Sequence, residues 1–585
     1  MFERIQTNYP DSSQFLNKSK MFFMDVFVLL LLSAFLYSLL ILARQWSAPL
    51  DAKVEIDLSL WALPQYAFLS FLRGMTAFAI SLAFTMVYGY IAAYRPKADR
   101  VLIPVLDILQ SIPVIGFLPS ALLALVSLFP SKTVGLELAS ILMIFTGQVW
   151  GMTFSFYQSL KTIPRDYLEM SSMYRFNFWQ RFIRLELPSS AMALTWNSMM
   201  GMAGGWFFLM ICESFTLGRN DFRLPGLGAY MTVAVAQNNF PAIIGGLSVM
   251  MALVVLINFG VWSPLLVWAQ KFKMEEGGSP VLPSTFFSNV LQKSRLWNFI
   301  LVKIAQPIDE YLSSVDKVQD ATQPSQPSWF KSYGKYFWKY GGYGLLVYVA
   351  GASVWFSIKL AQMLSHLSSA LWLDILQSTL WTFLRVSAAT ILASLWTIPL
   401  GIWIGSNVKR TERFQPLVQI LASFPAPMLY PLMIMLMQKM GMHLNLASIL
   451  MMMMGTQWYL LFNLIAGASI VPSEFREVGK AYGFSRMQRW KLIWIPAIFP
   501  SLVTGLVTSA GGSWNASIVT EYVSLGSESY SVQGLGSMIT TSAANGNFDL
   551  LAAGVIVMAL TVVFINRTLW GPLYKLAETK FTRTL

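Results

Sequence analysis

The sequence has few of the residues that form disulfides and metal sites. It contains one cysteine, Cys212, and two histidines, His366 and His443, among 585 residues. A single cysteine excludes an intramolecular disulfide and any metal site built from cysteines alone. The two histidines are far apart in sequence and lack the spacing of zinc ligands. We therefore expect no metal on this chain.

A nucleotide-binding loop is also absent. No Gly-x-x-x-x-Gly-Lys-Ser/Thr segment occurs in the sequence. In such a loop, backbone N–H groups hold the phosphates of ATP. The chain is therefore expected to carry no cofactor of its own and no catalytic motif, so any ATP would have to be hydrolysed by other chains.

Charged residues are scarce as well. They make up 12% of the chain, whereas hydrophobic residues make up 55% and the mean hydropathy is +0.55. Soluble domains carry about 25% charged residues. The deficit is typical of a polytopic membrane protein in a lipid bilayer. In a membrane protein, Lys and Arg gather in the cytoplasmic loops, and we attribute most of the formal net charge of +13 to this bias. We therefore expect no nucleic-acid partner.

Twelve apolar stretches are long enough for a helix that crosses a bilayer, which needs roughly 20 residues. They predict an all-α protein with about twelve transmembrane helices in two six-helix halves. The first six stretches are 21–43, 67–94, 103–129, 136–159, 189–214 and 242–269. The second six are 343–365, 377–405, 416–438, 445–469, 497–522 and 550–574.

The two halves are related by duplication. Phe-Leu-Arg at 71–73 recurs at 383–385, an offset of 312, and after a short indel the offset becomes 308. At that second offset Trp150 pairs with Trp458, and Gly-Leu-Gly at 226–228 recurs at 534–536. Because each half has an even number of spans, the repeats are parallel rather than inverted.

Lys and Arg gather in the loops that lie inside if the N-terminus is cytoplasmic, so both termini are expected in the cytoplasm. The acidic residues of the N-terminal segment and the long apolar run beyond it favour a retained first helix over a cleaved signal. The linker is rich in Pro, Ser and Gln. The expected parts are an N-terminal tail at 1–20, a first half at 21–272, a linker at 273–341, a second half at 342–578 and a C-terminal tail at 579–585.

A polar, basic segment interrupts the apolar pattern in the loop between the fourth and fifth spans of each half. In the second half it reads EVGKAYGFSRMQRWKLIWIP, from Glu477 to Pro496. Gly483 allows a tight turn between two short helices, and Pro496 suits the first turn of the next helix. The pattern predicts a helix–turn–helix elbow on the inner membrane surface.

This elbow resembles the EAA loop of binding-protein-dependent ABC importer permeases, which has Glu-Ala-Ala, three residues, Gly, nine residues and Ile-x-Leu-Pro. Val478 and Gly479 stand for the two alanines of that pattern. The first copy, EMSSMYRFNFWQRFIRLELP, keeps its glutamate and final proline but has arginine at the glycine position: Glu169, Pro188 and Arg175. Because arginine resists a left-handed turn, we expect the first elbow to have a different shape.

The resemblance covers roughly 65–272 and 375–578, and residues 378–407 and 423–432 resemble the nitrate, sulfonate and taurine branch of the family. It implies the type I ABC importer permease fold with both halves fused, in a bacterial cytoplasmic (inner) membrane. It also implies two ABC ATPase subunits that bind MgATP and dock on the elbows. An extracytoplasmic substrate-binding protein and a small anion such as nitrate, a sulfonate or bicarbonate are expected on the outer side.

Two pairs of charged residues recur at matching positions in the predicted spans. Arg73 and Arg385 lie at the outer end of the second helix of each half, and Glu213 and Glu521 lie at the outer end of the fifth. The arginines could snorkel to the surface, could attract an anion at an outer mouth, or could pair with the glutamates to hold an outer gate shut. The sequence leaves these three interpretations open.

Trp206 and Trp514 also recur, beside glycines in the fifth span of each half. Glycines let helices approach closely, so these tryptophans either contact substrate along a path or pack as ordinary core. Two other classes stay open for the whole chain. A twelve-span ion-coupled secondary carrier would need ionisable residues near the membrane midplane but no elbow. A membrane scaffold or sensor would not need paired polar groups along a pore.

Overall fold

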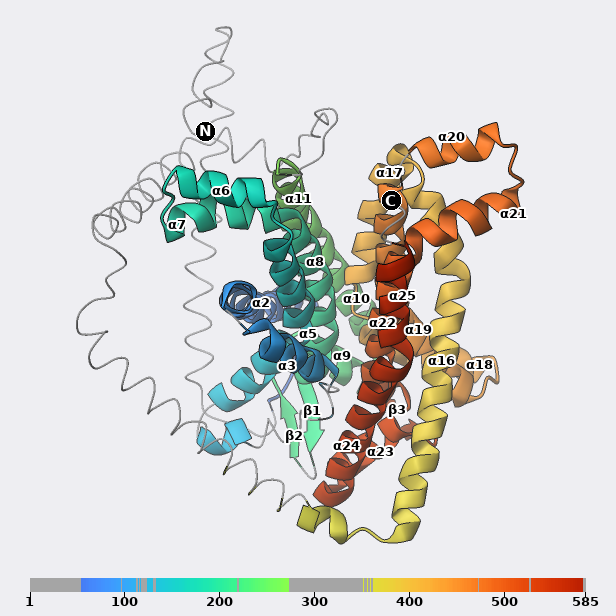
Figure 1. Ribbon diagram of the computed structural model, residues 1–585. Helices are drawn as coiled ribbons and strands as arrows, with labels where there is room; N and C mark the ends of the chain where they lie inside the picture. Colours follow the sequence, from blue (N-terminus) through green and yellow to red (C-terminus); the bar gives the residue numbers. More distant parts are fainter. Residues whose placement is uncertain are drawn as a thin grey trace, which may run out of the picture. The chain divides into compact units, whose positions relative to one another are not determined.

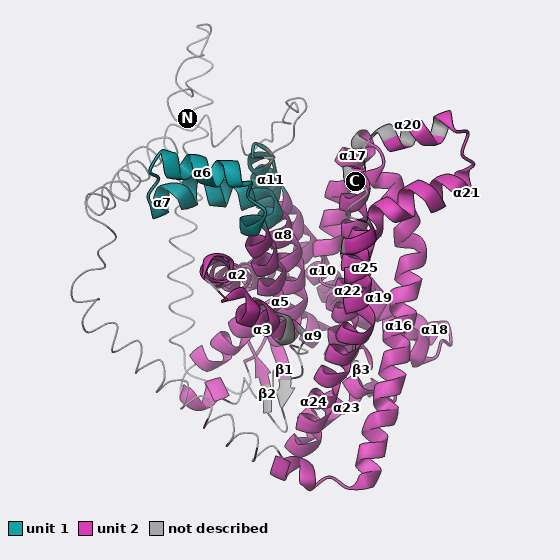
Figure 2. Cartoon of the chain, in the orientation of Figure 1, with its two compact units in different colours: residues 1–45, 159–195, 259–343 teal, residues 46–158, 196–258, 344–585 magenta. Residues whose placement is uncertain are grey.

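The computed structural model describes residues 54–272 and 351–581, apart from 96, 112–113, 115, 117–123, 130–132, 218–219, 352–354, 356–357, 359–360, 472 and 526–527. The chain divides into two units (Figure 2). In the described part, the first unit contains 159–195 and 259–272, and the second contains the remainder. Each unit is described by itself below.

The second unit contains most helices of both halves of the sequence (Figure 1). From the first half it holds α2 (Leu63–Tyr94), α3 (Asp99–Ser111), α5 (Val134–Lys161), most of α8 (Leu187–Cys212), the strands β1 (Ser214–Leu217) and β2 (Asn220–Arg223), α9 (Leu227–Ala236) and α10 (Phe240–Ile257). Most residues of these helices are apolar, as the composition predicts.

The second half of the sequence repeats this order within the same unit. It holds α16 (Ser369–Gly405), α17 (Val408–Ser423), η6 (Ala426–Leu429), α18 (Tyr430–Lys439), α19 (Leu444–Ile470), α20 (Ser473–Ala481), α21 (Arg486–Arg489), η7 (Trp490–Trp494), α22 (Ile495–Thr520), β3 (Tyr522–Leu525), β4 (Glu528–Ser531), α23 (Leu535–Asn545), α24 (Phe548–Ile565), η8 (Asn566–Trp570), α25 (Gly571–Leu576) and η9 (Ala577–Phe581). Helices α16, α19 and α22 pack against one another and form its core.

The first unit contains the polar loop of the first half. It holds α6 (Arg165–Met173), α7 (Phe178–Arg181), the π-helical turn η2 (Phe182–Glu186), the first turns of α8, the end of η3 (Asn258–Trp262) and α11 (Ser263–Gln270). Within it, the Nε of Arg181 lies 2.7 Å from Oε1 of the buried Glu186. This pair joins α7 to the turn that leads into α8.

The element boundaries repeat at a constant offset. The bounds of α8 and α22 differ by 308 at both ends, and so do those of β1 and β3 and of α10 and α24. The helix caps repeat too, since Asn239 and Asn547 each accept a backbone N–H three residues ahead. The duplication predicted from sequence is therefore present in the backbone itself.

The membrane spans agree with the sequence analysis in part. Seven helices in the described part are long and apolar enough to cross a membrane: Leu63–Tyr94, Val134–Lys161, Phe240–Ala269, Ser369–Gly405, Leu444–Ser469, Arg486–Thr520 and Phe548–Leu576. The expected span 189–214 corresponds to α8, a helix of 26 residues that is not among these seven. The expected span 21–43, the linker, most of 343–365 and part of 103–129 lie outside the described residues.

Two local predictions need correction. The expected span at 416–438 is not one continuous helix, because the chain bends by 72° between Lys409–Ser423 and Ala426–Lys439. Pro425 lies at this break, and proline disrupts the backbone pairing of a helix. Regions expected as plain outer loops also contain antiparallel hairpins, in which Ser214 pairs with Arg223 and Tyr522 with Ser531. The fold is still all-α, with two short hairpins added.

Candidate functional site

A buried arginine joins three segments of the first half. Arg73 of α2 has 1% of its side chain exposed. Its Nε donates to Oε2 of Glu137 at 2.6 Å, and its Nη2 donates to Oε1 of the same carboxylate at 3.0 Å. Its Nη1 donates to Oε1 of Glu213, which directly follows α8. The guanidinium also donates to the carbonyl of Pro225 at 2.9 Å.

The second half contains the matching arrangement. Arg385 of α16 donates from Nη1 to Oε1 of Glu521 at 2.8 Å. Its Nη2 donates to Oδ1 of Asn445 at 2.7 Å and to the carbonyl of Gln533 at 2.8 Å. Asn445 begins α19 and lies 308 residues after Glu137, as Glu521 does after Glu213. The two sites are therefore copies of one network.

A hydroxyl group and two backbone N–H groups complete the first network. The Ser70 hydroxyl donates to Glu213 at 2.6 Å and accepts the N–H of Leu227 at 2.9 Å. The N–H of Gly228 donates to Oε2 of Glu213 at 2.7 Å. A Cβ at Gly226 would lie 2.3 Å from this carboxylate. Glycine is required there because backbone and carboxylate approach so closely.

The second network uses Thr382 in place of the serine. Its hydroxyl donates to Glu521 at 2.8 Å and accepts the N–H of Leu535, also at 2.8 Å. The N–H of Gly536 donates to Glu521 at 2.9 Å, and a Cβ at Gly534 would lie 2.2 Å from the carboxylate. We call Ser70, Arg73, Glu137 and Glu213 the Arg73 cluster, and Thr382, Arg385, Asn445 and Glu521 the Arg385 cluster.

The clusters differ in formal charge. The Arg73 cluster has two carboxyl groups for one guanidinium, whereas the Arg385 cluster has one carboxyl group, because Asn445 replaces the second. All of these side chains are buried except that of Asn445, which is exposed. Removing one partner of a buried ion pair leaves the other charge uncompensated. Each cluster therefore fixes the relative position of three segments within its own half.

These contacts decide between the three interpretations of the recurring arginines. Arg73 and Arg385 are 1% and 5% exposed, so they neither snorkel to a surface nor offer a free cation to an anion. The structure contains the expected ion pairs with Glu213 and Glu521, whereas a role of these pairs in an outer gate stays a prediction. The partners come from the same half, so the pairs do not join one half to the other.

Four members of the clusters were not among the site residues expected from the sequence. Ser70 and Thr382 correspond at the offset of 312, and Glu137 and Asn445 correspond at 308. The repeat could therefore have indicated all four residues, because they are polar residues at matching positions in or beside apolar helices. Glu137 was more visible than Asn445, because a charged residue within an apolar stretch long enough to span a membrane is uncommon.

The two recurring tryptophans lie inside the helix packing. Trp206 and Trp514 are 2% and 3% exposed. A Cβ at Gly74 would lie 3.5 Å from the Trp206 ring, so the ring packs on α2 at a glycine. This placement fits the packing interpretation of both residues.

Among the described residues, no group of three or more His, Cys, Asp or Glu side chains gathers as a metal site.

The first elbow turns at an arginine in the left-handed region. Arg175 has φ +50°, and the N–H of Phe176 donates to the carbonyl of Ser171 at 2.9 Å, which closes α6. Asn177 and Gln180 then form a capping box that begins α7. Glu169 is exposed on α6.

The second elbow has the same backbone path. Gly483 has φ +64°, and the N–H of Phe484 donates to the carbonyl of Gly479 at 3.0 Å. Ser485 and Gln488 form the next capping box. The expectation that Arg175 gives the first elbow a different shape is therefore wrong. Two helix caps determine the turn, and they outweigh the intrinsic cost of a left-handed arginine, about 1–2 kcal/mol.

The remaining residues of the motif support the elbow in different ways. A Cβ at Gly479 would lie 2.6 Å from Cδ1 of Ile493, so glycine lets α20 approach η7 closely. Pro188 and Pro496 each occupy the second residue of the helix that follows, α8 and α22. Glu477, like its counterpart in the first elbow, is exposed.

Two segments of the chain, 85–262 and 397–569, match the model of a family described as binding-protein-dependent transport system inner membrane component. Together they cover more than half of the sequence. The two matches correspond to the two halves, which supports the duplication independently of the offsets.

Several curated proteins are similar over parts of the chain. The nitrate import permease protein NrtB of Leptolyngbya laminosa is 24% identical over 31% of this chain and 62% of its own length. The bicarbonate transport system permease protein CmpB of Synechocystis sp. is 23% identical over 30% of this chain and 57% of its own length. The taurine transport system permease protein TauC of Escherichia coli is 23% identical over 33% of this chain and 68% of its own length. The chain thus spans about half to two thirds of the length of these relatives.

Proposed function

The chain belongs to the family of binding-protein-dependent transport system inner membrane components, and from this membership we propose that it is the membrane-spanning permease of an ATP-driven importer. Both halves of the pore would be supplied by this one chain. The observation that carries the proposal is the elbow, which occurs once in each half with the same backbone turn at Arg175 and Gly483. A chain with two elbows can receive two ATPase subunits.

The elbows have the surfaces that docking needs. At corresponding positions each elbow exposes three large apolar side chains, Tyr167, Met170 and Tyr174 in the first and Phe475, Val478 and Tyr482 in the second. Exposed apolar patches commonly mark protein interfaces. We propose that each patch docks in one ATPase chain, and that MgATP is bound and hydrolysed there.

The proposed substrate is a small anion, delivered by a binding protein on the outer side of a bacterial inner membrane. This rests on relatives whose names refer to nitrate, bicarbonate and taurine transport. In this account both termini and both elbows are cytoplasmic.

We assign the two arginine clusters a mechanical role within each half. Every member of a cluster comes from one half, and each cluster joins the segment before α9 or α23 to two long helices. Each half would then move as one body when the ATPase subunits close. The clusters would hold the outer ends of the helices together rather than form a gate between the halves.

Uptake by purified protein tests this function. The chain is purified with the ATPase chains that accompany it, reconstituted in liposomes, and given labelled nitrate, bicarbonate or taurine together with the binding protein. We expect uptake of one of these anions that requires ATP and survives dissipation of ion gradients. Uptake driven by a gradient without ATP would contradict the proposal.

A further inference from the structure

An arginine stacks on an exposed tryptophan where α16 ends and α17 begins. The guanidinium carbon of Arg410 lies 4.8 Å from the centroid of the Trp403 ring, which is 46% exposed. The Phe414 ring lies 5.3 Å from the same indole. The π face of an indole attracts a guanidinium at this distance. The turn lies at the same end of the second half as α20 and α21 of the elbow (Figure 1), which is the cytoplasmic end in the proposed orientation.

The positive charge at this turn is not neutralised by the protein. Lys409 is exposed and Arg410 is half-buried. In the part of the chain that the structure describes, neither forms an ion pair, and the neighbouring Glu412 is exposed and also unpaired. The guanidinium of Arg410 donates to the hydroxyl of Ser406 at 3.5 Å. Since a guanidinium has five N–H groups, most of them are available to an anionic ligand.

An exposed apolar face of α17 continues from this arginine into the membrane. Positions 410, 414, 417 and 421 recur on one face of a helix, and Leu417 and Leu421 are 52% and 38% exposed. At 1.5 Å per residue, Leu421 lies roughly 16 Å along the helix axis from Arg410. This is about half of the ~30 Å thickness of a bilayer core. The face therefore matches the acyl chains of a single leaflet.

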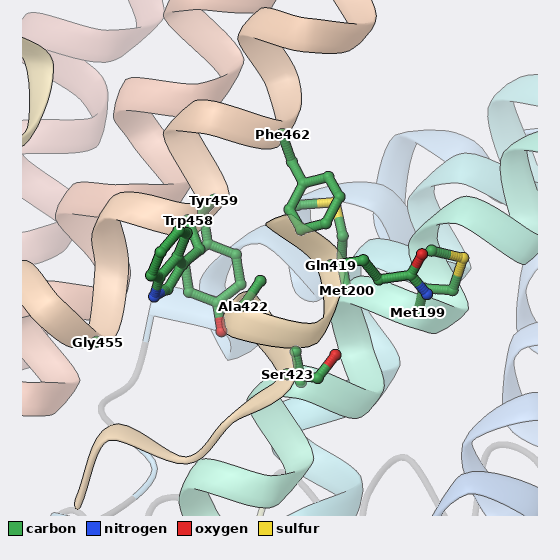
Figure 3. A pocket seen from close by; sticks show the side chains of 10 residues that line it. Met199, Met200, Gln419, Ala422, Ser423, Gly455, Trp458, Tyr459 and Phe462 are labelled. Carbon is green, nitrogen blue, oxygen red and sulfur yellow. The ribbon is translucent and has the colours of Figure 1, made fainter. Parts of the chain in front are cut away.

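The opposite face of α17 is covered by protein. Gln419, Ala422 and Ser423 lie on that face, beside Tyr459 and Phe462 of α19 (Figure 3). The space between these side chains is about 10 Å³, about what a single water occupies. Packing thus uses one face of α17 and leaves the face of Arg410 to the surroundings of the protein.

The first half has the apolar face without the charged, aromatic end. On α3, Val105 and Leu109 occupy the corresponding positions and are 41% and 42% exposed. The tryptophan and the arginine do not recur, because Ile91 and Ala98 stand at their positions at the offset of 312. An apolar surface toward lipid is therefore common to both halves, whereas a stacked arginine at its end belongs to the second half.

We propose that Trp403, Lys409 and Arg410 bind the phosphate headgroup of one anionic phospholipid of the cytoplasmic leaflet. Its acyl chain would lie along Leu417 and Leu421. Anionic lipids of this leaflet attract basic residues beside the membrane, and a guanidinium binds phosphate oxygens through two parallel N–H groups. Tryptophan is enriched at the level of the headgroups. The site depends on the proposed membrane orientation but not on import itself.

Lipid binding to the purified full-length chain tests the site. The chain is titrated in detergent with phosphatidylglycerol or phosphatidylcholine, and bound lipids are counted by native mass spectrometry. We expect one phosphatidylglycerol to bind at least about fivefold more tightly than phosphatidylcholine. Arg410→Gln should weaken its binding about fivefold, the effect of one basic residue beside an anionic surface. Trp403→Leu should also weaken it, because the indole holds the guanidinium in place.

Two matched variants serve as controls. Arg100 is exposed in the corresponding loop of the first half, and Trp268 is 41% exposed and lies 5.0 Å from the Phe272 ring, centroid to centroid. Arg100→Gln and Trp268→Leu should stay within about twofold of the unmodified chain. Arg410→Lys separates charge from shape, because lysine keeps the charge without the planar donors, and should bind between the unmodified chain and Arg410→Gln.

Three results would overturn the proposal. Equal affinity of the unmodified chain and Arg410→Gln for phosphatidylglycerol would remove the arginine from any lipid site. Equal affinity for the two lipids would show that the apolar face alone binds them. Displacement of phosphatidylglycerol by millimolar inorganic phosphate would indicate a site for free anions rather than for lipid. The titration uses neither ATP nor a transported anion, so its failure would leave the import function standing.

Discussion

At the scale of single residues, the account depends on two buried arginines. Each is surrounded by acceptors from its own half, and the carboxylates of Glu213 and Glu521 also each accept a backbone N–H. A buried ion pair contributes little compared with apolar residues of similar size, but breaking it from one side is expensive. A substitution in a cluster should therefore change the relative position of the segments that the cluster joins, rather than the charge of the protein surface.

Arg385→Gln should destabilise the protein. Glu521 would remain buried without its cation, at a cost of about 3–5 kcal/mol. Arg413 is exposed on α17, so Arg413→Gln should change stability by less than about 0.5 kcal/mol. The midpoint of thermal unfolding in detergent compares the two. Equal midpoints would show that the Arg385 cluster does not hold the half together.

The two carboxylates of the Arg73 cluster should not be equivalent. Glu213→Gln places an amide N–H against the donors of Arg73, Ser70 or Gly228, and should cost about 2 kcal/mol or more. Glu137→Gln keeps an acceptor for Arg73, as Asn445 does for Arg385 in the second copy, and should cost less than about 1 kcal/mol.

The same unfolding measurement tests that order. A variant at position 137 that is as unstable as one at position 213 would show that the first cluster needs both negative charges. The comparison is internal to one cluster, so differences in assembly do not affect it.

At the scale of elements, the elbows show how local signals determine a turn. Gly483→Arg should weaken the second elbow by about 1–2 kcal/mol, because a side chain at φ +64° is strained. No atom lies within 4 Å of the Cβ position, so the effect is conformational rather than steric. Arg175→Gly relieves the same strain in the first elbow and should leave activity unchanged or slightly higher.

Substrate-stimulated ATP hydrolysis in the reconstituted complex measures this effect. We expect Gly483→Arg to lower stimulation severalfold and Arg175→Gly to match or exceed the unmodified chain. Full stimulation with Gly483→Arg would show that the second elbow tolerates the strain as the first one does.

How much of these elements the sequence could predict depends on the range of the interactions. The lengths of the apolar stretches predict α2, α5, α16 and α19, because a helix that crosses a bilayer needs a long apolar segment. The constant offsets predict the duplication, because repeated motifs can be recognised in a single sequence. The bend at Pro425 and the left-handed backbone of Arg175 depend on competition between local free-energy contributions of similar size. The partners Glu137 and Asn445 depend on contacts between distant segments, which a single sequence does not display except through its repeat.

At the scale of the whole molecule, both permease halves are part of this one chain instead of two separate chains. The linker at 273–341 lies outside the described residues, and its composition predicts a tether. Cutting the chain between 275 and 330 and co-expressing the fragments should therefore leave an assembled transporter with ATP-driven uptake near that of the intact chain. Fragments that assemble but do not transport would assign the linker a further role.

The central claim is that this chain supplies both halves of the pore and both ATPase docking sites. The mass of the purified complex, measured by native mass spectrometry from detergent, tests it most directly. The account predicts two ATPase chains for each copy of this chain. A complex that contains two copies of this chain with two ATPase chains, or one copy with a single ATPase chain, would contradict it.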